Sequence, residues 1–340
     1  MRGGLLPANL KTTSVLRRIH FCNTLRYIKA PGFEGQVSAF KLVDGSEPIV
    51  VEGVSGRAMT LLPGDLFLGT PGHRESPRWV VGDIPRGGLV PGKIYWLLAD
   101  SGLVGDLVAG TPHAKTFLGQ ARYLGAVASE DGQIVTIKHF AVTTPRRQAD
   151  HQAPVFLFVG TAPEVGKTTA GLMVLRALLD KGHETVIVLK ATGTASLAEI
   201  TAYQDFGAAQ AFDCVDFGLP STHPSNRTGI DRSFDRMLDT CFSLPADAVL
   251  IECGGDVVGL NVPTFLRRLR RRRTHPKVIL AAGDALGALG ATWMLRKMGL
   301  TADLITGPCT DTPAVQQRTQ ALCKAPAMNL ARGKSDGAVS

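Results

Sequence analysis

The sequence predicts an α/β protein whose C-terminal part is a mostly parallel, doubly wound sheet, preceded by a smaller β-rich domain. The chain has 340 residues, enough for two separate hydrophobic cores. From Pro154 onward, short apolar runs alternate with amphipathic stretches, which is the pattern of parallel strands joined by helices. Between residues 34 and 142, short alternating runs are separated by turn signals such as Asp44-Gly45, as in a small barrel or sandwich.

The C-terminal pattern is regular enough to place each element. Strands are expected at 154–160, 185–190, 211–216, 247–252, 277–282, 303–307 and 326–330. Helices are expected at 168–181, 196–208, 230–243, 262–273, 285–298 and 312–323, with Gly182 and Gly299 ending the first and fifth. Sheets of this kind bind ligands at the carboxyl ends of their strands.

The N-terminal part has a different character. In the β-rich domain, 34–142, strands are expected at 36–43, 48–54, 78–81, 93–98, 121–128 and 134–142. Residues 1–33 contain basic but no acidic side chains, so they are interpreted as a disordered extension or a targeting segment. Residues 143–153 are expected to be a linker, 154–331 the second domain and 332–340 a flexible tail.

Composition limits the class of protein. No apolar run reaches the roughly 18 residues that span a bilayer, so no membrane segment is expected. The six cysteines include no C-x-x-C pair, which argues against a zinc ribbon or disulfide scaffold and favours the reducing cytoplasm. The net charge of +8 suits an anionic ligand or nucleic acid. The arginine run at 267–273 is interpreted as a solvated helix end, so nucleic acid is not expected as a partner.

The stretch from Val155 to Thr169 carries the clearest functional signal. An apolar run ending at Gly160 is followed by a loop, and Lys167 opens an amphipathic helix. This strand–loop–helix order is typical of a phosphate-binding loop, in which backbone N–H groups and the helix N-terminus hold phosphate oxygens. Lys167 is expected to neutralise the β- and γ-phosphates of ATP, and Thr168 to hold Mg²⁺. The predicted nucleotide-binding residues are Gly160, Thr161, Glu164, Val165, Gly166, Lys167, Thr168 and Thr169.

Charged side chains at other predicted strand ends extend this site. Lys190 ends the second strand, and Glu252 ends the fourth, where a buried acid beside a phosphate loop predicts a Mg²⁺ ligand. Asp216 is a candidate second ligand; Asp205, Asp213 and Asp231 are weaker ones. Cys253 is interpreted as a packing residue rather than a nucleophile.

An irregular segment after Gly218 is the candidate substrate loop. Loops at the ligand edge of such a sheet are often functional, although an ordinary surface loop explains the segment equally well. Its polar side chains suit an anionic small molecule. The predicted substrate residues here are Ser221, His223 and Arg227.

The motifs resemble those of dethiobiotin synthetase and its ATPase relatives, the MinD-like and cobyrinic-acid amidase-like proteins, over residues 154–331. The resemblance rests on five residues between Gly160 and Gly166, on Glu-Val before Gly-Lys-Thr, and on Glu252-Cys-Gly-Gly. It implies that Lys190 holds the reacting carboxylate and the γ-phosphate, that Thr194 supplies a hydroxyl, and that Glu252 binds metal. Ala191, Cys253 and Asp256 depart from the family pattern. Residues 306–309 correspond to the region where relatives contact the nucleotide base.

A second resemblance is to a P-loop family that includes D-glutamate N-acetyltransferase. It rests on Lys-Ala-Thr-Gly-Thr at 190–194, Val-Asp-Phe-Gly at 215–218 and Glu-Cys-Gly-Gly at 252–255. The N-terminal half of that family is α/β, whereas the present one is predicted to be β-rich. This resemblance keeps amino-acid N-acyl transfer open as a function.

Three functions follow from these resemblances. The first is a cytoplasmic, homodimeric ligase or phosphotransferase that uses ATP and Mg²⁺ on a small carboxylate or amino-acid-like substrate, with Lys167, Lys190 and Glu252 as catalytic residues. The second is an ATPase switch or regulatory protein, and the third is the N-acyltransferase. Switch ATPases of this class carry a signature lysine early in the loop, where this chain has Thr161, Ala162 and Pro163. The missing lysine favours the enzyme.

Overall fold

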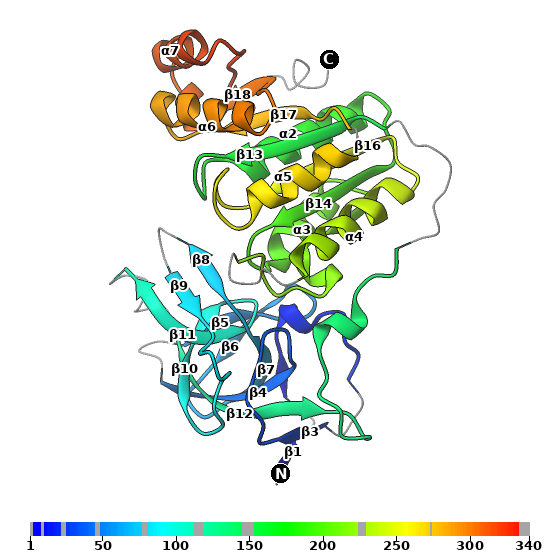
Figure 1. The fold of residues 1–340 in the computed structure, drawn as a ribbon, viewed down its shortest axis with the longest axis vertical. Coiled ribbons are helices and arrows are strands. Elements are labelled where there is room, and N and C mark those ends of the chain that lie inside the picture. Colours follow the sequence, from blue (N-terminus) through cyan, green and yellow to red (C-terminus); the bar gives the residue numbers. More distant parts are fainter. Residues whose placement is uncertain are drawn as a thin grey trace. The chain divides into compact units, whose positions relative to one another are not determined.

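The computed structural model describes residues 3–7, 10–21, 25–44, 48–76, 80–111, 118–144, 153–223, 229–272 and 274–332. The chain forms two compact units (Figure 1). Unit 1 comprises Met1–Val142, Thr194–Ala198 and Cys214–Ser225. Unit 2 comprises Thr143–Gly193, Glu199–Asp213 and Asn226–Ser340.

Unit 2 is built on a six-stranded sheet in the order β15-β14-β16-β13-β17-β18, with all neighbouring strands parallel. Its strands are β13 (Val155–Gly160), β14 (Val186–Thr192), β15 (Gln210–Phe212), β16 (Ala248–Cys253), β17 (Lys277–Ala281) and β18 (Leu304–Thr306). Every residue of β13, β14 and β16 is buried, as expected for central strands covered on both faces.

Six helices connect and cover this sheet. They are α2 (Lys167–Asp180), α3 (Leu197–Asp205), α4 (Ile230–Ser243), α5 (Val262–Arg271), α6 (Ala285–Lys297) and α7 (Pro313–Cys323). The chain runs from β13 across to β14, and later returns from β16 to β17 in the opposite direction. Because such crossovers are right-handed, this reversal places α5 on the opposite face from α2, which Figure 1 shows. The predicted doubly wound α/β class is thus confirmed.

Two predicted strands of this sheet differ from the structure. The strand expected at 211–216 ends at Phe212, and a 3-10 helix, Cys214–Phe217, follows it. The strand expected at 326–330 is reduced to a single parallel bridge between Ile305 and Ala327. The chain turns away directly afterwards, because the Asn329 side chain accepts hydrogen bonds from the backbone of Ala331 and Arg332.

Unit 1 contains a small closed barrel. The strands β12, β4, β7, β11 and β10 pair in succession, and β10 pairs back to β12, which closes the ring. Closure leaves these five strands without a free edge. Their bounds are β4 (Ser38–Asp44), β7 (Leu66–Pro71), β10 (Ile94–Ala99), β11 (Leu103–Gly110) and β12 (Gln120–Ala128). The predicted β-rich N-terminal region is therefore present.

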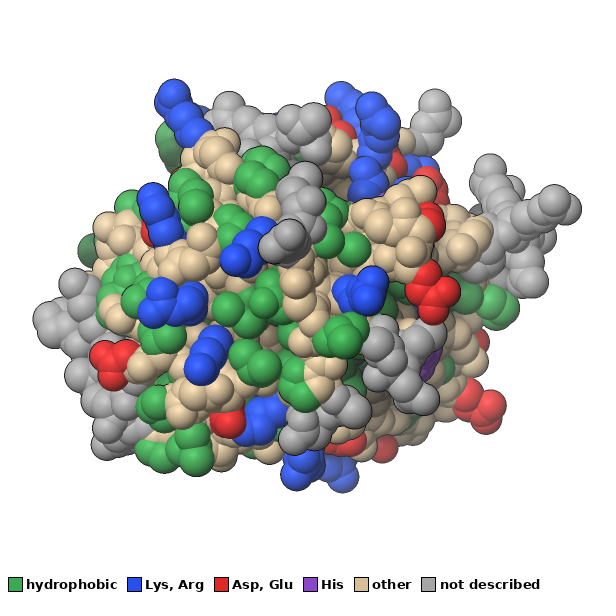
Figure 2. All heavy atoms as spheres, turned by 90° about the horizontal axis from the view of Figure 1, so that it is seen from below, with side chains coloured by type: hydrophobic (Ala, Val, Ile, Leu, Met, Phe, Trp, Pro, Cys, Tyr) green, Lys and Arg blue, Asp and Glu red, His purple; other side chains and the backbone are tan. Residues whose placement is uncertain are grey.

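Shorter strands extend the barrel sheet. They are β1 (Gly4–Leu6), β2 (Lys11–Thr12), β3 (Leu25–Ile28), β8 (Arg74–Ser76) and β9 (Val80–Asp83), and β5 (Ile49–Glu52) pairs separately with β6 (Ala58–Leu61). Segment 1–33, expected as an extension, thus contributes three strands. The strand expected at 134–142 is instead two isolated bridges and a 3-10 helix, Ile137–Phe140. On the face drawn in Figure 2, the basic side chains shown in colour lie apart among apolar and uncharged ones.

The barrel core centres on three aromatic rings. Phe40 is fully buried and lies 5.4 Å from the Phe67 ring and 5.5 Å from the Tyr123 ring, measured between centroids. The Tyr123 hydroxyl donates to the carbonyl oxygen of Ala30 at 2.9 Å, so its polar end is satisfied inside the core. The three strands that supply these rings, β4, β7 and β12, are neighbours in the ring.

Truncation of this cluster tests the barrel assignment. Phe40→Ala is expected to lower the free energy of unfolding by about 3–5 kcal/mol, because it removes buried contacts and leaves a cavity. Phe33→Ala is the matched control: that ring is 46% exposed, and its removal should change the free energy by no more than about 0.5 kcal/mol. Chemical denaturation of both variants measures the difference, and equal losses would contradict the assigned core.

Candidate functional site

The loop between β13 and α2 has the backbone geometry of an anion cradle. Glu164 and Gly166 both have positive φ, +61° and +90°, and α2 begins at Lys167 without a side-chain cap. The first N–H groups of this helix are therefore available to a ligand, and the helix dipole favours negative charge there. The loop is anchored to the end of β17, since Thr161 N–H donates to the Ala281 carbonyl at 3.0 Å.

Lys167 lies across this loop. Its ammonium donates to the carbonyl oxygens of Ala162 and Gly255, at 2.8 Å each, and the residue is only 6% exposed. A Cβ at position 160 would stand 2.9 Å from Cδ of Lys167, so glycine gives the lysine room to pass. Burial lowers the pKa of Lys167, and the neighbouring Glu252 opposes that shift. A bound anion would therefore be favoured beside this buried positive charge.

Glu252 and Thr168 meet at the next strand. Glu252 is the last residue but one of β16, is 2% exposed and pairs with Phe158 of β13 in the sheet register. The Thr168 hydroxyl donates to Oε1 of Glu252 at 2.9 Å, and the Tyr203 hydroxyl donates to Oε2 at 2.7 Å. The Thr168 hydroxyl and the Glu252 carboxylate are both oxygen ligands, which Mg²⁺ prefers. Two protein ligands are enough for such an ion, because Mg²⁺ usually keeps several waters and binds phosphate oxygens.

Among the described residues, no group of three or more His, Cys, Asp and Glu side chains is arranged to hold a metal ion. A dedicated cage of protein ligands is therefore not seen in that part of the chain. A Mg²⁺ ion held by Thr168 and Glu252 would need water and phosphate oxygens as its other ligands, as in many nucleotide sites.

Lys190 completes the group of charges at this edge. It lies on β14, opposite Glu252 on β16 in the register, and it is 7% exposed. Its ammonium forms an ion pair with Glu199 at the start of α3. The carboxyl edge of the sheet thus brings Lys167, Lys190 and Glu252 together, while their catalytic roles stay predictions.

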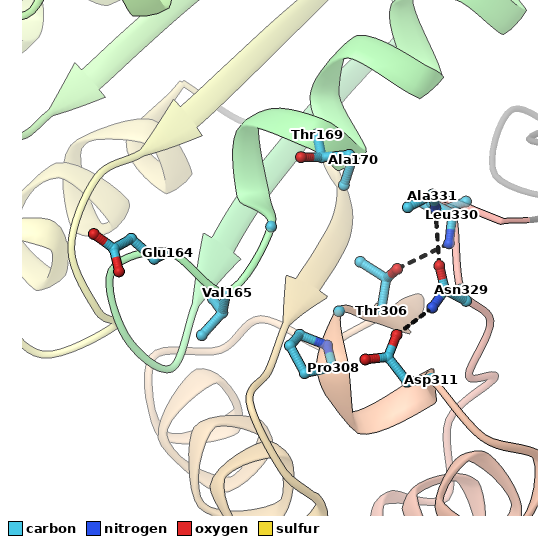
Figure 3. A pocket seen from close by; sticks show the side chains of 12 residues that line it. Glu164, Val165, Thr169, Ala170, Thr306, Pro308, Asp311, Asn329, Leu330 and Ala331 are labelled. Carbon is cyan, nitrogen blue, oxygen red and sulfur yellow. Dashed lines mark hydrogen bonds between the residues drawn. The ribbon is translucent and has the colours of Figure 1, made fainter.

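A cavity of about 170 Å³ adjoins the loop (Figure 3). Glu164–Gly166 and Thr169 line one side, and Thr306–Pro308 with Asp311 line another. Its polar side chains are held in place: Asn329 donates to Asp311 Oδ1 at 2.8 Å, and Thr306 accepts from Leu330 N–H at 3.1 Å. Sequence analysis identified residues 306–309 but missed Asp311 and Asn329, which carry no motif of their own.

Asp216 differs from its predicted placement. It lies in the 3-10 helix after β15, in unit 1, rather than at a strand end. Its carboxylate forms ion pairs with Arg17 at 2.8 Å and with Arg18 at 3.4 Å. Two guanidinium groups already balance this buried charge, which argues against Asp216 as a Mg²⁺ ligand.

The predicted substrate residues gather in unit 1. Thr194 and Ser221 form a backbone bridge, and the Ser221 hydroxyl donates to the carbonyl oxygen of His73 at 2.7 Å. The His223 ring stacks on that of His73 at 5.4 Å, and His73 pairs with Asp83. Burial and the neighbouring His73 lower the pKa of His223. Arg227 lies outside the described residues.

Asp256 and Cys253, which depart from the family pattern, have structural contacts. Asp256 Oδ1 accepts from the backbone N–H groups of Val258 and Gly259, so the carboxylate shapes the loop after β16. Cys253 is 1% exposed, and burial together with the charge of Glu252 raises the pKa of its thiol to about 12. Such a thiol is protonated at neutral pH and is a poor nucleophile.

The strand order, the left-handed backbone at Glu164 and Gly166, the buried Lys167 and Glu252, and Thr168 beside them define the class of this domain: it has the P-loop fold. No protein-family model matches the chain. No curated protein matches it either.

Solved structures similar to this chain include signal recognition particle receptors and a signal recognition particle protein. They include the receptor FtsY from Elizabethkingia anophelis in complex with GDP (16% identity, 58% of this chain and 55% of that chain, TM-score 0.34). FtsY from Mycoplasma mycoides matches at 13% identity, over 57% of this chain and 68% of that chain, with a TM-score of 0.38. The signal recognition particle 54 kDa protein from Aeropyrum pernix K1 in complex with GDP matches at 14% identity (57% and 47%, TM-score 0.37).

This chain thus covers about half of the E. anophelis receptor and of the A. pernix protein. Similarities with TM-scores this low support no argument about the function of this chain. The fold class stated above follows from the loop and the sheet alone. In the part of the chain that the structure describes, no helix is both long and apolar enough to cross a bilayer.

The assignment of Cys253 as a packing residue predicts its reactivity. Because its pKa is raised to about 12, Cys253 is expected to stay unmodified by iodoacetamide at pH 8 in the native protein and to react fully after denaturation. Peptide mass spectrometry resolves it from the other cysteines. Rapid alkylation of native Cys253 would instead restore it as a candidate nucleophile.

Proposed function

We propose that this protein is a Mg-ATP-dependent enzyme of the dethiobiotin synthetase-like class that phosphorylates or ligates a small carboxylate or amino-acid-like substrate. The observation that carries the proposal is the cluster of Lys167, Lys190 and Glu252 at the carboxyl edge of one parallel sheet, beside an anion cradle. Two ammonium groups suit the charge of a transferring phosphoryl group, and a buried carboxylate suits its Mg²⁺.

In this proposal the loop binds the phosphates of ATP. Lys167 exchanges its two backbone carbonyls for β- and γ-phosphate oxygens, and the first turn of α2 supplies N–H donors. Lys190 leaves Glu199 to hold the γ-phosphate and the reacting carboxylate. Thr168 and Glu252 hold Mg²⁺, which neutralises phosphate charge when bound.

The cavity beside Glu164 and Val165 is the proposed place of the base. Thr306, Asp311 and Asn329 give it fixed donors and acceptors, and Glu164, Val165 and Gly166 of the phosphate loop form its other wall. The resemblance to dethiobiotin synthetase implies ATP. GDP is the nucleotide named in the E. anophelis and A. pernix structures, so GTP is the direct competitor in a binding experiment.

The alternatives are an ATPase switch and an amino-acid N-acyltransferase. The switch shares the proposed nucleotide site but needs a protein partner, and the loop positions 161–163 carry no signature lysine. Acyl transfer needs an acyl donor in place of a phosphoryl group. On the resemblance alone we propose a homodimer or higher homo-oligomer, and we propose a cytoplasmic location because the six cysteines of the sequence include no C-x-x-C pair.

Nucleotide turnover with a panel of small acids tests the proposed function. We expect the purified chain to hydrolyse ATP with Mg²⁺, and at least one carboxylic or amino acid to raise that rate severalfold. Lys167→Ala should abolish ATP binding, because it removes the ammonium group that lies across the loop between Ala162 and Gly255. Turnover that depends on a partner protein and on no small molecule would support the switch, and unchanged ATP affinity in Lys167→Ala would refute the loop.

Glu252→Gln tests the Mg²⁺ site. The amide keeps the size of the carboxylate but loses its charge, so Mg²⁺ affinity in turnover should fall by about tenfold or more while ATP binding without metal changes little. Asp256→Asn is the matched control, since it makes the same size-preserving change at a carboxylate that accepts backbone N–H groups instead of the Thr168 hydroxyl. An unaltered Mg²⁺ titration in Glu252→Gln would remove this residue from the site.

A further inference from the structure

Tyr203 reaches the site from α3, an element that the motifs do not include. Its hydroxyl lies 2.7 Å from Oε2 of Glu252, and the residue is 1% exposed. The sequence contains no signal for this contact, because 49 positions separate the two residues along the chain.

A glycine in α2 makes room for this hydroxyl. A Cβ added at Gly171 would stand 2.0 Å from the Tyr203 hydroxyl oxygen and 2.9 Å from the adjoining ring carbon. Glycine inside a helix costs roughly 1 kcal/mol relative to alanine. Gly171 lies one turn beyond Lys167 in α2, so the space that glycine leaves for the hydroxyl lies close to the phosphate loop.

The chemistry of the contact makes the Tyr203 hydroxyl the hydrogen-bond donor, because a carboxylate oxygen accepts and a phenol carries the proton. Glu252 therefore has a hydroxyl donor on each oxygen: Thr168 from α2 on Oε1 and Tyr203 from α3 on Oε2. With both oxygens held, the carboxylate group has one fixed orientation.

We propose that Tyr203 is a positioning residue, which fixes Glu252 so that Oε1 stays turned toward Thr168 and the place of the Mg²⁺ ion. The proposal rests on the proposed function, because it assigns Glu252 to the metal. In this arrangement Tyr203 acts through Glu252 and touches neither nucleotide nor metal. Its hydroxyl matters for metal use, and its ring matters for packing.

Tyr203→Phe separates these two roles, because it removes the hydroxyl and keeps the ring. We expect ATP affinity without metal to stay within about twofold. The Mg²⁺ concentration for half-maximal turnover should rise about tenfold, or kcat should fall by that factor, as for other groups that orient a metal ligand. Thermal unfolding of both proteins shows whether the fold is retained.

Gly171→Ala provides the second variant. The added methyl group overlaps the Tyr203 hydroxyl, so in the parent chain it should displace that hydroxyl and reproduce the Mg²⁺ defect. In the double variant with Tyr203→Phe, the fold-change in the Mg²⁺ requirement should be much smaller than the product of the two single fold-changes. Gly290→Ala in α6 is the matched control, because nothing lies within 4 Å of its added Cβ.

The outcomes separate this inference from the proposed function. A parent protein with Mg²⁺-dependent turnover, and a Tyr203→Phe variant with the same Mg²⁺ titration and kcat, would overturn the role of Tyr203 alone. If the fold-changes of Gly171→Ala and Tyr203→Phe multiply in the double variant, the role of Tyr203 would also be overturned. The Mg²⁺ defect of Gly171→Ala would then come from disturbed helix packing rather than from the loss of the Tyr203 hydrogen bond. A parent without Mg²⁺-dependent nucleotide turnover would overturn both proposals.

Discussion

The burial of opposite charges at the carboxyl edge of one sheet is the constraint on which the rest of unit 2 depends. Glu252 is almost fully buried, and a buried carboxylate is costly unless donors and cations surround it. Thr168 and Tyr203 supply the donors, Lys167 lies close enough for its charge to interact with that of Glu252, and Lys190 faces Glu252 in the strand register. These five residues come from four elements, β14, β16, α2 and α3, so the site exists only when all four are in place.

The phosphate loop and its helix could be predicted from the sequence because their determinants are local. Gly166 has the left-handed backbone that glycine favours, and Lys167 begins α2 within one residue of the expected start. The placement of Lys190 and Glu252 could also be predicted, because the carboxyl ends of parallel strands share one edge of a sheet. The six helices of unit 2 could be predicted from hydrophobic periodicity, which is also local: each helix buries one apolar face.

The features that could not be predicted from the sequence depend on residues far apart along the chain. Asp216 follows an apolar run, yet the chain leaves the sheet after Phe212 and the carboxylate pairs with Arg17 and Arg18, about 200 positions earlier. The barrel strands β7 and β11 have continuous buried stretches that lack a two-residue period, so their sequences gave no alternation to detect. Asp311, Asn329 and Tyr203 reach their partners through tertiary structure alone, and no motif marks them.

Helix α3 shows why such a residue can matter as much as the motif. Glu199 and Tyr203 stand four positions apart, so they lie on the same face of the helix. One binds Lys190 and the other binds Glu252, which are paired across β14 and β16. If Lys190 moves to a phosphate, Glu199 loses its partner, whereas Tyr203 keeps Glu252 with or without the nucleotide. On the proposed function, the same helix face thus carries one contact that a ligand would replace and one that it would leave in place.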